Sequence, residues 1–190
     1  MKVKKKYCGI DESGRGALAG PVVVASVIFK SYENIPFGIK DSKLLTFLKR
    51  KELYIKIKRT ADIGLGIISS RVIDEIGINK AINNASETSI NSNSGSAELI
   101  FLDAGIKPNT EIKFLNIVKG DSNYVSIAAA SIVAKYHRDN IMIKLSGEYK
   151  KYNWKQNKGY GTKDHLLAIE NYGITEEHRK SFKPICKVND

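Results

Sequence analysis

The chain is poor in the residues that build zinc sites. It has two cysteines, Cys8 and Cys186, and three histidines among its 190 residues. The cysteines form no Cys-x-x-Cys pair, and no histidine cluster lies near either of them. Zinc sites need several such ligands at short spacing, so the sequence offers no zinc site. We expect both cysteines to be reduced thiols in a cytoplasmic protein.

Long apolar segments are also lacking. The apolar stretch at residues 18–29 is too short to cross a bilayer, which takes about 20 residues. Residues 1–6 resemble the basic start of a secretion signal, but Asp11, Glu12 and Arg15 interrupt the apolar run that should follow. We therefore expect neither export nor membrane insertion.

Negative charge is scarce relative to positive charge. The chain has 31 Lys and Arg against 20 Asp and Glu, a formal net charge of +11. A surface with this balance attracts polyanions, which makes nucleic acid the leading class of partner. Lysine is also a common solubilising residue, so the charge alone leaves that simpler role open.

The pattern of apolar residues predicts an α/β fold. The chain has the length of one ordinary domain. Runs rich in apolar and β-branched residues predict strands at 7–10, 21–29, 61–69, 99–102 and 114–118. Helical spacing predicts helices at 43–58, with Ser42 as the cap, and at 79–89, 126–145, 163–171 and 176–180. This order is typical of a mixed central sheet flanked by helices.

The composition changes after Gly147. Residues 149–163 mix lysines with Tyr152, Trp154 and Tyr160. We therefore expect a main domain over residues 1–147 and a small, basic and aromatic C-terminal helical extension over residues 148–190 that packs on the same domain. Tyr152 and Trp154 are expected in the core of this extension, with contact to a nucleic-acid strand as the alternative.

Acidic residues follow several of the predicted strands. Asp11 and Glu12 come after the first strand, and Asp103 and Asp121 come at or just beyond the last two. Buried carboxylates repel each other and lose hydration, and a bound cation relieves both penalties. Oxygen ligands without His or Cys favour Mg²⁺ or Mn²⁺, and two such ions form a clamp for phosphodiester hydrolysis. An exposed turn with solvated acids is the alternative for Asp11 and Glu12.

Side chains alternate along a strand, so Asp11 and Glu12 can share one ion only if the strand ends or bulges there. Gly14, Arg15 and Gly16 follow directly and make such a departure plausible. Two closely spaced glycines also let the backbone approach a sugar and its phosphate. The same run resembles a dinucleotide-binding turn, but that motif needs a helix after the glycines, and residues 22–28 are strand-like.

Six ordered segments resemble the motifs of bacterial type 2 ribonuclease H, also called ribonuclease HII. They are GIDESGRGALAGP at 9–21, DSK at 41–43, FLDAG at 101–105, KGDSNYVSIAAASIVAKYHRD at 119–139, KGYGT at 158–162 and HRKSF at 178–182. Together they extend over nearly the whole chain. The departures from the usual motifs are Ser13, Ala17, Ala104 and the pair Tyr136-His137, and none of them removes a functional group.

The resemblance implies a ribonuclease H-like fold for the main domain and a metal-dependent endoribonuclease activity. It makes four residues the ligands of two Mg²⁺ or Mn²⁺ ions: Asp11, Glu12, Asp103 and Asp121. The implied substrates are RNA–DNA hybrids and duplex DNA with embedded ribonucleotides. Cleavage 5′ of a ribonucleotide would leave 5′-phosphate and 3′-hydroxyl ends.

The resemblance also implies the residues that bind the substrate. Gly14, Arg15 and Gly16 would recognise the ribose 2′-hydroxyl, the group that separates RNA from DNA. Lys43 would contact a backbone phosphate, and Tyr160 would stack on the sugar beyond the scissile bond. We expect the protein to act as a monomer.

Two alternatives remain open. A DNA-directed nuclease or integrase of the same fold would share the acids but lack a reader of the 2′-hydroxyl. A non-catalytic nucleic-acid-binding module would need only the basic C-terminal segment, but it leaves the four acids unexplained. Asp139 lies one helical turn after Lys135, so we expect it to form an ion pair rather than bind a metal ion. The histidines, His137, His165 and His178, show no ligand spacing and are expected to be structural.

Overall fold

The computed structural model describes residues 6–40, 42, 45–103 and 105–185. Its centre is a five-stranded sheet in the order β3-β2-β1-β4-β5. The strands are β1 (Tyr7–Ser13), β2 (Val22–Phe29), β3 (Ala61–Ile68), β4 (Leu99–Asp103) and β5 (Phe114–Ile117). β1 and β3 are antiparallel to β2, whereas β1, β4 and β5 are mutually parallel. The predicted mixed sheet is therefore confirmed.

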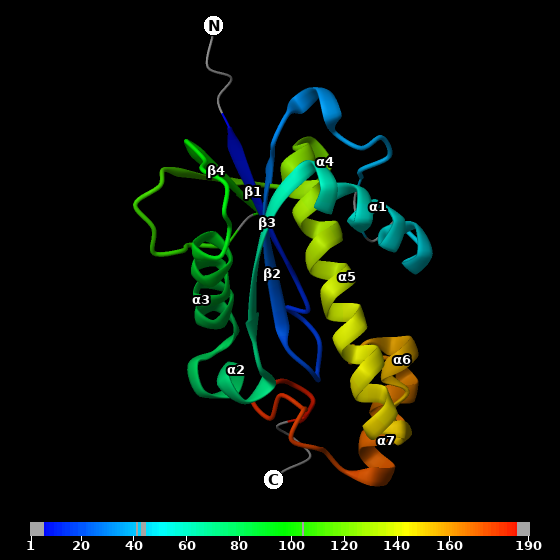
Figure 1. Cartoon of the computed structure of the whole chain (residues 1–190). Coiled ribbons are helices and arrows are strands. Elements are labelled where there is room, and N and C mark those ends of the chain that lie inside the picture. Colours follow the sequence, from blue (N-terminus) through cyan, green and yellow to red (C-terminus); the bar gives the residue numbers. More distant parts are fainter. Residues whose placement is uncertain (1–5, 41, 43–44, 104, 186–190) are drawn as a thin grey trace, which may run out of the picture.

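Helices cover both faces of this sheet (Figure 1). On one face lie α1 (Phe47–Thr60) and the long α5 (Val125–Glu148). On the other lie α2 (Ser70–Ile76) and α3 (Ile78–Asn91). The short helices are α4 (Gly120–Asn123), α6 (Trp154–Asn157) and α7 (Lys163–Tyr172), with 3₁₀ turns at Tyr32–Asn34 and Lys150–Tyr152.

The sequence of β2 explains why both faces are covered. Every residue of the strand is buried, and its side chains alternate between two hydrophobic clusters. Val23, Ala25 and Val27 pack against α1 and α5, while Val22 and Val24 pack against α3. Burying a side chain of this kind stabilises the fold by about 1.5–3 kcal/mol, so an uninterrupted apolar strand is stable only between two layers of helices.

Close contact between α5 and β1 depends on small residues. Ala128, Ala129 and Ala130 near the start of α5 are all buried. Gly9 of β1 lies so close to the helix that a Cβ at this position would be 2.1 Å from the carbonyl carbon of Ser126. The first turns of α5 are thereby held against β1. The contact is at Gly9, two residues before Asp11.

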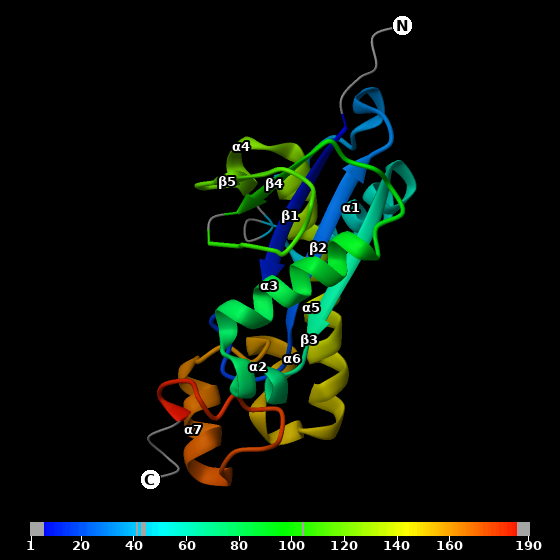
Figure 2. The ribbon, with the colours of Figure 1, turned by 90° about the vertical axis from the view of Figure 1, so that its left-hand side faces the viewer.

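A third hydrophobic cluster joins the C-terminal segment to the rest of the protein. Tyr152, Trp154 and Ile169 pack with Met142 of α5 and with Leu18, which precedes β2. Figure 2 shows α6, α7 and the final described residues gathered at one end of the sheet. Tyr152 and Trp154 are buried here, as predicted. The division of the chain after residue 147 stays a prediction, although α5 ends one residue later.

Helix α1 begins later than predicted. Its cap is Thr46, whose Oγ1 accepts a hydrogen bond from the Lys49 amide at 3.3 Å. The hydroxyl of Ser42 lies instead 2.8 Å from that of Ser131 on α5. A helix from residue 43 capped by Ser42 is therefore wrong, and Lys43 lies outside the described residues.

The predicted helix at 176–180 is also wrong. These residues form turns, with His178 bridged to Ala19. The carboxylate of Asp74 accepts the amides of Lys180 and Ser181 at 2.8 and 3.0 Å, which fixes the end of the turn. Partners distant in the sequence determine this segment. The short helices α2, α4 and α6 were not predicted.

Candidate active site

The strand register places the backbones of Asp11 and Asp103 next to each other. Parallel pairing between β1 and β4 ends with Ile10 opposite Leu102. The next residue on each strand is an aspartate, Asp11 on β1 and Asp103 on β4. The side chain of Asp103 lies outside the described part of the structure.

Asp11 and Glu12 belong to an unbroken strand. β1 stays paired with β2 without a bulge as far as Ser13 opposite Val23, so the expected end or bulge of the strand at these acids is wrong. Both acids nevertheless line the same pocket. Asp11 is only 6% exposed, and one of its carboxylate oxygens accepts the Glu12 amide at 2.8 Å. The side chain of Glu12 is 12% exposed. An exposed turn with solvated acids is therefore excluded.

Arg15 pairs with only one of the two carboxylate oxygens of Glu12. The Arg15 Nε donates to Glu12 Oε1 at 2.7 Å, and its Nη1 donates to Asn79 on α3 at 3.3 Å. The second oxygen, Glu12 Oε2, is buried and has no hydrogen-bond partner among the described residues. An unsatisfied buried carboxylate oxygen is costly, and a cation is a suitable partner for it.

Asp121 lies just beyond β5, as predicted. It belongs to the first turn of the short helix α4, which the sequence did not predict. Lys119 adopts a left-handed conformation with φ 53°, which redirects the chain into this helix. Asp121 is half-buried and lines the same pocket as Asp11 and Glu12.

Every predicted site residue whose side chain is described lines one pocket of about 280 Å³. They are Asp11, Glu12, Gly14, Arg15, Gly16, Asp121 and Tyr160. Among the described residues, no three His, Cys, Asp or Glu side chains lie close enough to hold a metal ion. The chemistry of the donor set still fits Mg²⁺ or Mn²⁺, because it combines buried carboxylates with the unsatisfied oxygen of Glu12.

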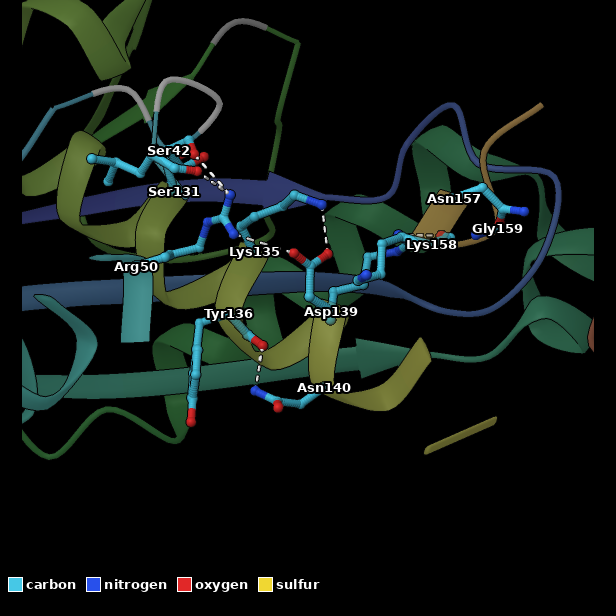
Figure 3. Close-up of polar contacts among 12 residues, drawn as sticks. Ser42, Arg50, Ser131, Lys135, Tyr136, Asp139, Asn140, Asn157, Lys158 and Gly159 are labelled. Atoms are coloured by element: carbon cyan, nitrogen blue, oxygen red, sulfur yellow. Dashed lines mark hydrogen bonds and ion pairs between the residues drawn. The ribbon is translucent and has the colours of Figure 1, made fainter. Parts of the chain in front are cut away.

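Lys135 of α5 also lines this pocket, and its role there was missed from the sequence. Its Nζ is 2.5 Å from Asp139 Oδ1, and Arg50 Nη1 is 3.3 Å from Asp139 Oδ2. Figure 3 shows both cations directed at this one carboxylate. The predicted ion pair is confirmed, but Asp139 is buried rather than at the surface. Ser131, one turn before Lys135, lines the pocket as well, so their helical spacing is the signal that could have indicated both.

Tyr160, which also lines the pocket, lies between α6 and α7. Two cations approach its ring, Lys135 at 5.6 Å and Arg138 at 5.1 Å from the ring centre. Its backbone carbonyl accepts hydrogen bonds from the Thr162 amide at 2.8 Å and from His165 Nδ1 at 3.0 Å. These contacts fix both the ring and the backbone of Tyr160.

The remaining predictions concern cysteines and membranes. Cys8 is a free, buried cysteine, and burial raises the pKa of its thiol to about 12. Cys186 lies outside the described residues. No helix in the described ranges has the length and apolar character needed to cross a membrane.

Comparison with known proteins identifies the family. The sequence model of the ribonuclease HII family matches residues 8–185. Ribonuclease HII of Bacillus mycoides is 51% identical over 178 residues, covering 93% of this chain and 68% of that protein. Ribonuclease HII of Wolbachia sp. subsp. Brugia malayi is 45% identical over 184 residues, covering 97% and 91% respectively. The crystal structure of ribonuclease H2 from Pyrococcus horikoshii has a TM-score of 0.80 at 26% identity, covering 96% of each chain. The chain therefore belongs to the ribonuclease HII family of metal-dependent endonucleases that act on RNA–DNA hybrids.

Proposed function

We propose that this protein hydrolyses the RNA strand of RNA–DNA hybrids and cuts duplex DNA 5′ of single embedded ribonucleotides. The observation that carries the proposal is the shared pocket, where buried carboxylates meet a glycine-containing loop and an aromatic ring. Carboxylates alone would suit any nuclease of this fold. A backbone loop able to approach a ribose is what favours RNA.

We assign the metal ligands to Asp11, Glu12, Asp103 and Asp121. Bound Mg²⁺ or Mn²⁺ would supply positive charge at the scissile phosphate and lower the pKa of a bound water. The burial of Asp11 and the unsatisfied Oε2 of Glu12 support this assignment. Glu12 Oε1 is already neutralised by Arg15, so Oε2 is the oxygen available to a cation. The backbone register of β1 and β4 supports the inclusion of Asp103.

We assign substrate binding to other residues of the pocket and to nearby basic side chains. Gly14, Arg15 and Gly16 would recognise the 2′-hydroxyl through their backbone groups, with Tyr160 against the adjoining sugar. Lys43 would hold a backbone phosphate, and Lys135 is placed to do the same because it lines the pocket. Cleavage would leave 5′-phosphate and 3′-hydroxyl ends. We also propose that the protein acts as a monomer in the cytoplasm.

The direct test is cleavage of a labelled DNA duplex that contains one ribonucleotide, with and without Mg²⁺ or Mn²⁺. We expect a single cut 5′ of the ribonucleotide that requires the metal ion. An otherwise identical all-DNA duplex should stay intact. Equal cleavage of both duplexes would favour the DNA-directed nuclease, and binding without cleavage would favour the non-catalytic module.

Two variants test the metal ligands. Asp11→Asn and Glu12→Gln keep the shape of each side chain but remove the negative charge, so each should lower the rate at least about 100-fold while binding is largely kept. Glu75→Gln is the matched control, because Glu75 is a surface acid on α2 that pairs with Arg71. Retention of more than about a tenth of the wild-type rate by the first two variants would contradict the assignment.

A further inference from the structure

Two buried arginines hold the loop between β1 and β2. Arg138 of α5 donates to the carbonyls of Ala19 at 3.0 Å and Pro21 at 2.9 Å. Arg179 of the C-terminal segment donates twice to the carbonyl of Gly20, at 3.0 and 2.9 Å, and once to that of Arg15, at 3.0 Å. Both side chains are fully buried. Arg138 and Arg179 thus fix the loop that follows β1, one from α5 and the other from the C-terminal segment.

Burying these two arginines carries a large desolvation penalty. Burial lowers the pKa of Arg138, and it is the main cause that lowers the pKa of Arg179 to about 9. Among the described residues, neither guanidinium forms an ion pair with a carboxylate, and their hydrogen bonds go to neutral carbonyls. Apolar side chains of similar volume often stabilise a core as well as or better than buried charges. What arginine adds is a rigid fork of donors that fixes the direction of several carbonyls at once.

The contact with Arg15 determines the direction of one particular peptide group. The peptide bond is planar and trans, so the carbonyl of Arg15 and the N–H of Gly16 point in opposite directions. Arg179 holds that carbonyl by a hydrogen bond from its buried guanidinium. Gly16 lines the active-site pocket, and its N–H direction is therefore set by Arg179.

Arg138 links the same loop to Tyr160. Gly14 has φ +97°, and a Cβ at this position would lie 2.0 Å from Arg138 Nε, so the loop backbone rests directly on the guanidinium. Arg138 also donates to the carbonyl of Lys158 at 2.9 Å and lies 5.1 Å from the centre of the Tyr160 ring. One side chain thus sets the distance between the loop and the ring.

We propose that Arg179 and Arg138 are positioning residues for sugar recognition. Arg179 orients the Arg15–Gly16 peptide toward the ribose 2′-hydroxyl, and Arg138 holds Tyr160 in register with it. The inference rests on the proposed function of this site. It makes the C-terminal segment, through Arg179, a determinant of the choice between RNA and DNA.

The test compares two duplexes that differ in one group, a 2′-hydroxyl or a 2′-fluorine on the single modified nucleotide. Discrimination is the ratio of kcat/KM for the two duplexes, measured with excess enzyme. Arg179→Lys keeps the charge but loses the fork, so it should lower the ratio about 5- to 10-fold, the worth of about one hydrogen bond. Arg138→Lys should lower it as well. A purely structural role would reduce cleavage of both duplexes equally and leave the ratio unchanged.

Arg50→Lys is the matched control. Arg50 is also a buried arginine that donates to backbone carbonyls, those of Ser42 at 3.1 Å and Leu45 at 2.9 Å, but neither carbonyl belongs to the loop between β1 and β2. Its ratio should equal that of the wild type. An equal fall in the ratio for Arg50→Lys would overturn the inference.

A second measurement needs no variant. The amides of residues 17–20 are all hydrogen-bonded to backbone carbonyls, so they should exchange slowly with solvent in the wild-type protein. Exchange at the rate of an unstructured peptide would overturn the inference, because the loop would then not be held. Failure of the wild-type protein to cut the ribonucleotide duplex would instead overturn the proposed function itself.

Discussion

Two buried histidines predict that acid weakens the fold. The Nε2 atoms of His165 and His178 are 3.2 Å apart, next to Trp154. The Thr175 amide donates to His178 Nδ1 at 2.9 Å, so the proton of His178 must be on Nε2 and donate to His165. His165 Nε2 then accepts from His178 and from Trp154, and its own proton on Nδ1 donates to the Tyr160 carbonyl. Both rings are neutral, and an added proton would place two N–H groups against each other.

The size of the effect follows from the pKa of His178. Burial, with a smaller contribution from His165, lowers this pKa from 6.5 to about 4. Between these two values the unfolded chain binds a proton that the folded chain does not, so stability is lost as the pH falls through this window. For a shift of this size, lowering the pH from 7.5 to 5.0 costs about 2 kcal/mol. Burial also lowers the pKa of His165, which adds to the loss in the same direction.

Urea unfolding at pH 7.5 and pH 5.0 measures this loss. Trp154 is the single tryptophan of the chain and touches the histidine pair, so its fluorescence reports the relevant region. The variant His178→Gln should be less stable than the wild type at pH 7.5, but its stability should fall by about 2 kcal/mol less on acidification. The same pH dependence in both proteins would refute the argument.

Further predictions concern packing, charge and substrate choice. Gly9→Ala should destabilise the protein by at least about 1–3 kcal/mol in urea unfolding, because its Cβ would overlap the backbone of α5; an unchanged midpoint would contradict the close contact. Asp139→Asn should cost about 3–5 kcal/mol by the same assay, because it leaves Arg50 buried without its carboxylate; a loss below about 1 kcal/mol would mean that the pair is effectively solvated. Tyr160→Ala should lower kcat/KM at a single ribonucleotide by about 5- to 150-fold, and by less on continuous RNA, which offers further 2′-hydroxyl contacts; equal losses would mean that Tyr160 only places the strand. Duplex affinity should fall with rising salt, as expected for a protein of charge +11; a constant affinity would make the charge a solubility feature.

The sheet could be predicted because its strands are locally consistent. The predicted ends of β2, β3, β4 and β5 agree with the structure to within about one residue. β1 runs further than predicted, through Asp11, Glu12 and Ser13, since pairing with β2 continues where the sequence turns polar. The change from apolar to polar residues therefore marks the first active-site residue and does not mark the end of the strand.

The errors fall where distant partners decide the local structure. Ser42 has the right side chain for a helix cap, but it bonds Ser131, 89 positions away. The segment at 176–180 has helical composition, but its backbone groups bond to Asp74 and to residues 18–20. Local propensity is worth a few tenths of a kcal/mol per residue, and tertiary hydrogen bonds exceed it.

The same limit applies to the active site. The sequence motifs indicated the carboxylates and the glycine loop, since metal binding and backbone approach need particular residue types. The roles of Arg138 and Arg179 could not be predicted in the same way. Both lie within motif segments, at 119–139 and 178–182, but an arginine beside other basic residues looks like a surface charge. Their guanidinium groups are fully buried against backbone carbonyls and cannot reach a phosphate. These two arginines therefore contribute to the formal positive charge but serve to hold the loop rather than to bind nucleic acid. The number of phosphate contacts must be counted from exposed lysines and arginines only.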